Sequence, residues 1–148
     1  MLAGFVRALV LAGAVLIGTS AAQAQKSFVR DDLASEAVRL EERVRTETAA
    51  ARDVRPAAEL RREFDLAMNR GDPRRALALA TAAATAEPRV AANWMAYARA
   101  ANAVNPRDWS ERYQLQERAT TAAYLAYQRA TARADEATSL ALLGETYA

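Results

Sequence analysis

The chain has 148 residues, with 20 basic and 18 acidic side chains, abundant alanine, and neither histidine nor cysteine. Without those two residue types it lacks imidazole acid–base chemistry, thiolate nucleophiles and the usual zinc ligands, so we expect no catalytic residue, metal site or cofactor site. The balanced charge argues against nucleic-acid binding, and alanine favours helix throughout.

Residues 1–24 have the features of a secretory signal peptide. Arg7 lies in a short charged leader, residues 8–17 are almost entirely apolar, and residues 22–24 form the small-polar-small pattern that signal peptidase accepts. The apolar run is shorter than the roughly 20 residues that span a bilayer, so cleavage before Gln25 is favoured over an uncleaved anchor. Without cysteine there is no lipid acceptor. We expect an exported, periplasmic protein with no membrane contact after cleavage.

Residues 25–55 are predicted to form an N-terminal helix and a linker. Asp31 or Asp32 can cap the helix, and its periodicity is lost over residues 48–55, just before Pro56. We expect the helix to pack on its own neighbours, the alternative being that it docks on a partner or on another part of the parent protein. Its apolar face, with spacings of 4, 3 and 4 residues, consists of Leu33, Ala37, Leu40 and Val44.

Residues 56–148 are predicted to form helical hairpins of the tetratricopeptide type. In the first hairpin Gly71 ends a helix, Asp72 caps the next one, and Pro73 takes the first helical position, where its missing N–H costs nothing. Paired helices that cross closely require small side chains at their seam. Those of the first hairpin are Ala76, Ala80 and Ala83, and Pro88 ends it.

The second hairpin repeats this pattern at the expected period. If Ala57 is position 1 of the first repeat, Leu60 is at position 4. Trp94 lies 34 residues after Leu60, which is the length of one repeat, so it is at position 4 of the second repeat. Tyr97 and Ala98 then take the seventh and eighth places. We therefore expect Trp94 in the core.

About twelve extra residues interrupt the second hairpin between positions 101 and 112. Asp108 with Glu111 three residues later resembles a capping box, so a new helix is predicted to start there and to run to about Thr131. Trp109 is expected to act as a hydrophobic staple, the alternative being an exposed anchor. The small seam residues of this helix are Ala122 and Ala126.

A third hairpin opens at Ala137 and is truncated. Its first helix carries the L-x-x-L-G-x-x-Y signature on Leu140, Leu143, Gly144 and Tyr147. The array is degenerate, with two full hairpins and half of a third. The residues that depart from the consensus are Glu63, Ala67, Ala101 and Arg129.

The concave surface of such an array takes side chains from the first helix of each hairpin. Mixed arginine, methionine and amide side chains there could hold an extended peptide or another domain. The alternative is an ordinary solvated groove. The predicted protein-binding residues are Arg61, Asp65, Met68, Asn69, Met95, Arg99 and Asn102.

Adjacent carboxylates occur at residues 31–32 and 41–42, but they do not suggest an active site. Neighbouring residues on a helix point about 100° apart, so such a pair cannot flank one substrate bond. We interpret them as solvated helix charges.

Two stretches resemble a known family. Residues 26–44, KSFVRDDLASEAVRLEERV, and residues 111–148, which begin ERYQLQERATTAAY, resemble the N-terminal helical region of bacterial alpha-2-macroglobulin family proteins. The resemblance implies a large exported protease-trapping inhibitor in which this segment positions or partners later domains. Many members carry a Cys-Gln thioester. This chain has no cysteine, so any inhibitory activity would belong to a part of the protein that is not represented here.

The sequence therefore leaves three functional hypotheses. The first is the helical preamble of such an inhibitor. The second is a free-standing periplasmic adaptor of the tetratricopeptide type. The third is the helical arm of an envelope enzyme such as a lytic transglycosylase. In each case we expect a scaffold that acts through protein contacts and is not itself an enzyme.

Overall fold

A computed structural model describes residues 31–147, and within that range every regular element is a helix. The predicted all-α class is therefore confirmed for the described residues, whereas the predicted signal peptide over residues 1–24 lies outside them. The six helices in chain order are α2 (Asp31–Ala51), α3 (Ala57–Asn69), α4 (Pro73–Ala86), α5 (Ala91–Ala103), α6 (Trp109–Arg129) and α7 (Arg133–Tyr147).

The turn between α3 and α4 forms as its sequence predicts. Gly71 has a φ of +71°, in the left-handed region that glycine adopts without steric cost. The Asp72 side chain then accepts a hydrogen bond from the Arg75 backbone N–H, and Pro73 is the first residue of α4. The three residues thus reverse the chain within a short loop, which directs α4 back along α3.

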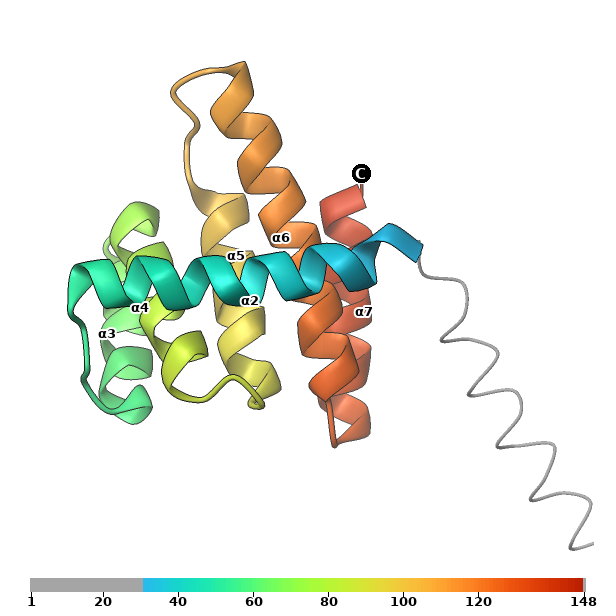
Figure 1. Cartoon of the computed structure of the whole chain (residues 1–148), viewed down its shortest axis with the longest axis horizontal. Helices are drawn as coiled ribbons and strands as arrows, with labels where there is room; N and C mark the ends of the chain where they lie inside the picture. Colours follow the sequence, from blue (N-terminus) through green and yellow to red (C-terminus); the bar gives the residue numbers. More distant parts are fainter. Residues whose placement is uncertain (1–30, 148) are drawn as a thin grey trace, which may run out of the picture. The chain divides into compact units, whose positions relative to one another are not determined.

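From α3 to α7 each helix packs against the next one in the chain (Figure 1). The loops between them are only three to five residues long, so neighbouring helices run in opposite directions. In addition, α5 contacts both α3 and α7. The helices that open the predicted hairpins are therefore also neighbours of one another.

Alanine side chains form much of the core between these helices. All five alanines predicted at the two seams have at most 1% of their surface exposed. Because a methyl group projects so little, the helix axes can approach closely and bury the backbone between them. The five residues are Ala76, Ala80, Ala83, Ala122 and Ala126.

Helix α2 lies across the row formed by the other helices (Figure 1). The Thr85 hydroxyl of α4 lies 3.1 Å from the Val44 carbonyl oxygen and 2.9 Å from the Thr48 hydroxyl, so polar contacts fix α2 on α4. The predicted apolar face is buried, which shows that α2 packs on its own neighbours. It consists of Leu33, Ala37, Leu40 and Val44.

The predicted linker is shorter than its sequence suggests. Helix α2 continues to Ala51 because Thr48 extends its buried face by one more turn. The break comes at Arg52, which has a φ of +54°. After it, Arg55 forms ion pairs with Asp53 at 2.8 Å and with Glu63 of α3 at 2.7 Å, which hold the linker against α3.

Candidate functional site

The residues predicted to form a protein-binding groove lie on α3 and α5, two helices in direct contact. Met68, near the end of α3, and Met95, near the start of α5, are half-buried and each packs against the core. The polar members of the set are exposed. These are Asp65, Asn69, Arg99 and Asn102.

Arg61 differs from the rest of the predicted set because its side chain is engaged within the protein. One guanidinium nitrogen lies 2.6 Å from a Glu87 carboxylate oxygen and 3.0 Å from the Asn93 amide oxygen. Asn93 is fully buried and donates hydrogen bonds to the carbonyl oxygens of Ala83 and Glu87. Arg61 thus ties α3 to the end of α4 and the start of α5, which is a structural role.

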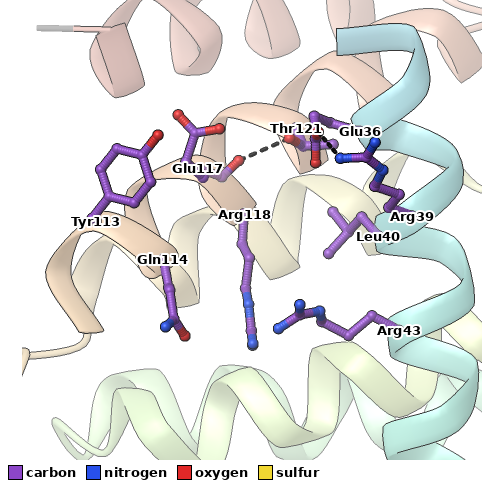
Figure 2. Close-up of a pocket in the computed structure, with 9 residues that line it drawn as sticks. All are labelled: Glu36, Arg39, Leu40, Arg43, Tyr113, Gln114, Glu117, Arg118 and Thr121. Atoms are coloured by element: carbon purple, nitrogen blue, oxygen red, sulfur yellow. Dashed lines mark hydrogen bonds and ion pairs between the residues drawn. The ribbon is translucent and has the colours of Figure 1, made fainter. Parts of the chain in front are cut away.

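A second concavity, which the sequence does not suggest, lies between α2 and α6 (Figure 2). It has a volume of about 360 Å³. It exists because α2 crosses α6 instead of running alongside it. Its lining residues are Glu36, Arg39, Leu40 and Arg43 from α2, and Tyr113, Gln114, Glu117, Arg118 and Thr121 from α6.

The charged side chains of this cleft are only partly paired. Arg39 pairs with Glu36 at 2.7 Å on the surface of α2, and Arg118 pairs loosely with Glu47 at 3.5 Å. Arg43 forms no ion pair with any residue that the structure describes. Figure 2 shows the guanidinium groups of Arg43 and Arg118 turned toward each other from the two helices. The cleft floor therefore carries positive charge without a balancing carboxylate between the two arginines.

The hydroxyl of Tyr97, on α5, is close to the same charged groups. Tyr97 is fully buried, and its hydroxyl makes no hydrogen bond within the described part of the chain. Burial raises the pKa of this hydroxyl, and the Arg118 guanidinium partly offsets the rise. Glu47 and Arg43 are its other charged neighbours. A polar atom is thus left unsatisfied where α2, α5 and α6 meet.

The first turn of α6 is held by an ion-pair network around Glu111. The predicted cap is confirmed, since the Glu111 backbone N–H donates to the Asp108 carboxylate at 2.8 Å. The Glu111 carboxylate accepts two hydrogen bonds from Arg74 of α4, at 2.8 and 3.0 Å, and another from the Arg107 backbone N–H. These contacts, led by Arg74, hold the pKa of Glu111 well below its usual range. They fix the helix that carries Tyr113 and Arg118.

Trp109 is not the hydrophobic staple that the sequence predicts. Its surface is 77% exposed, and Tyr113, one helical turn later, is 60% exposed. Residues four apart share one face of a helix, so the two rings present an aromatic strip to solvent. The staple fails because Asp108 caps α6, which makes Trp109 the first helical residue, whereas a staple uses the residue before the cap. The exposed anchor, which was the alternative interpretation, describes the observed position.

The neighbouring carboxylates Glu41 and Glu42 of α2 pair with different partners, and they are not equally exposed to solvent. Glu42 pairs with Arg45 on the exposed surface. Glu41 is partly buried and pairs with Arg129 of α6. The interpretation of Glu41 as a solvated charge is therefore wrong, because the crossing of α2 over α6 brings it a partner that the sequence spacing cannot show.

Neither a metal site nor a membrane-spanning helix is found in the part of the chain that the structure describes. Residues 31–147 contain no group of three or more potential metal-ligating side chains. None of the helices in that range is both long and apolar enough to cross a bilayer.

A scan against protein-family models, a search of curated proteins and a search of solved structures found no match for the chain.

Proposed function

We propose that this chain is an exported protein-binding module of the tetratricopeptide type. The observation that carries the proposal is the contact between α3 and α5, two helices that each bear a half-buried methionine and exposed polar side chains. Methionine is a flexible side chain that adapts its shape to a bound surface, and polar neighbours supply hydrogen bonds. Because Arg61 is engaged internally, the proposed binding residues are Asp65, Met68, Asn69, Met95, Arg99 and Asn102.

The helix positions support the repeat. Helices α3 and α5 begin 34 residues apart, at Ala57 and Ala91, which is the length of one tetratricopeptide unit. The fourth residues of these helices, Leu60 and Trp94, are both completely buried. Leu140, at the corresponding place of the proposed third unit, is 46% exposed. A second helix covers Leu60 and Trp94 in their hairpins, and none covers Leu140 among the described residues.

We further propose, from the resemblance alone, that the module is the N-terminal part of a bacterial alpha-2-macroglobulin-like protease-trapping inhibitor that is exported to the periplasm. The α3–α5 surface would then hold a later domain of the same protein. This proposal predicts an open reading frame that continues into β-rich domains. It also predicts a mature N-terminus at Gln25, which N-terminal sequencing of the periplasmic protein tests. A stop codon directly after Ala148 would contradict the inhibitor and leave a free-standing adaptor.

The binding surface itself is tested by site-specific crosslinking in cells that produce the protein. A photoreactive phenylalanine analogue is introduced at Arg99 or Asn102, with Val38 as the control position, since it is 67% exposed on α2. We expect adducts from Arg99 and Asn102, either with a partner protein or with a later domain of the same chain. Equal adducts from Val38, or none from the α3–α5 surface, would refute the proposed groove.

A further inference from the structure

The cleft between α2 and α6 brings together two arginines that the fold leaves without a shared anion. Among residues 31–147, Arg43 has no ion pair and Arg118 has one, the loose pair with Glu47. Their guanidinium groups face each other (Figure 2). Both arginines line the same cleft, and like charges repel each other, so an anion placed between them would be bound favourably. The planar N–H groups of arginine are also suited to hold a carboxylate through two hydrogen bonds.

The hydroxyl of Tyr97, which does not itself line the cleft, is a second observation near these arginines. It is buried and makes no hydrogen bond of normal geometry among the described residues, and the charged groups that act on it are Arg118, Glu47 and Arg43. Buried polar atoms without partners are uncommon in proteins and often mark a place where a water molecule or a ligand atom is bound. The polar groups at the meeting point of α2, α5 and α6 are thus incompletely satisfied by the chain itself.

The aromatic strip of α6 is a third feature of the same region. Tyr113 lines the cleft, and Trp109 lies one turn further along the same helix face. Large aromatic side chains are enriched at the centres of protein-binding surfaces, and here both are mostly exposed. An apolar side chain of a ligand could pack on this strip while an anionic group reaches the arginines.

The charges around the cleft limit which anion can bind. Three arginines line it, but so do Glu36 and Glu117, and Glu47 lies beside Arg118. Such a nearly neutral surrounding does not attract a polyanion such as a nucleic acid or an anionic membrane surface. It leaves room for one negative charge at the floor between the two guanidinium groups. A single carboxylate on a peptide meets this condition.

We propose that the α2–α6 cleft binds a short peptide segment of a partner protein, with one carboxylate held between Arg43 and Arg118 and an apolar side chain packed on Tyr113. This site is separate from the α3–α5 surface and does not depend on its function. The crossing of α2 over α6 then serves ligand recognition as well as helix packing.

The proposal is tested by fluorescence anisotropy with the purified chain of 148 residues. The probe is a fluorescent pentapeptide, amidated at its C-terminus, that carries two leucines and one glutamate. The matched control peptide has glutamine in place of the glutamate. We expect the glutamate peptide to bind about tenfold more tightly or better, since the ionised acceptor strengthens both hydrogen bonds, and we expect added salt to reduce the difference.

Four variants locate the interaction. Arg43→Gln removes a charge that has no internal partner, so the fold should be retained, and the preference for the glutamate peptide should disappear. Arg118→Gln should have the same effect, provided that its circular dichroism melting curve shows a folded protein. Arg45→Gln, on the same helix, removes an exposed arginine paired with Glu42 and should leave the preference intact. A groove variant, Arg99→Glu, should also leave it intact, which separates this site from the α3–α5 surface.

Several outcomes would overturn the proposal. Equal binding of the two peptides would show that no carboxylate is recognised. An equal loss in Arg45→Gln would show a general effect of charge. Displacement of the peptide by inorganic phosphate but not by acetate at the same ionic strength would assign the arginines to a phosphate. Retention of the preference in Arg43→Gln would remove the arginine pair from the site.

Discussion

The guanidinium group of Arg129 lies over the indole ring of Trp94, with its central carbon 5.3 Å from the ring centroid. Trp94 is completely buried in α5, and its Nε1–H donates to the Pro88 carbonyl oxygen at 2.8 Å. The same arginine also pairs with Glu41 of α2. One side chain near the end of α6 therefore connects α5, α6 and α2. Arg129 departs from the consensus of the proposed repeat, and this contact gives a structural reason for the departure.

Replacement of Arg129 by methionine should lower the free energy of unfolding by about 1 to 3 kcal/mol, because it removes a cation–π contact and leaves Glu41 unpaired in a partly buried position. Urea unfolding followed by circular dichroism measures the change. Arg45→Met is the matched control, since it removes an exposed pair on the same helix as Glu41. Equal stability of the two variants would show that the contact with Trp94 contributes nothing.

Enlargement of the alanine seam should destabilise the first hairpin. Ala80 is 1% exposed between closely packed helices, so Ala80→Leu should cost about 1 to 3 kcal/mol through overpacking. Ala78→Leu places the same side chain on the exposed face of α4 and should change the melting temperature little. An unchanged melting temperature in Ala80→Leu would contradict the assigned helix pairing.

The polar contacts between α2 and α4 should contribute measurably to the docking of α2. Thr85→Val keeps the shape of the side chain but removes a hydroxyl that contacts Val44 and Thr48, so we expect a loss of about 1 kcal/mol. Thr46→Val is the control, because its hydroxyl bonds only to its own helix. If proteolysis within α2 is no faster in Thr85→Val than in Thr46→Val, these contacts do not hold the helix.

Acid should weaken the fold through Glu111. Its pKa in the folded protein lies below the unfolded value of about 4.3, so its contribution is complete above that pH and is lost as the pH falls toward the folded pKa. Arg74 and Arg107 then lose their partner. The urea midpoint of the native chain should fall between about pH 5 and pH 2, and it should fall less in Glu111→Gln. The exposed Glu145→Gln should follow the native curve, and identical curves for all three proteins would exclude Glu111 as a source of acid sensitivity.

Local features were predicted well where one short segment contains all the interacting groups. The turn at Gly71–Pro73 and the cap by Asp108 depend on backbone conformation and on hydrogen bonds within a few residues. The staple expected at Trp109 is wrong because Asp108 caps α6, so Trp109 is the first helical residue, whereas a staple uses the residue before the cap. Its 77% exposure depends on which elements pack beside the start of α6, and the spacing of residues does not encode that packing.

The sequence by itself determined the helical class, the hairpin turns and the alanines of the seams, because these follow from propensity, capping and a 3.6-residue period. Only the tertiary structure decided that α2 crosses the row and that Arg129 stacks on Trp94. It also decided that Arg61 is engaged internally and that Arg43 and Arg118 line one cleft. The physical reason is that these pairs join residues far apart in the chain, and long, flexible side chains reach partners that helix packing selects.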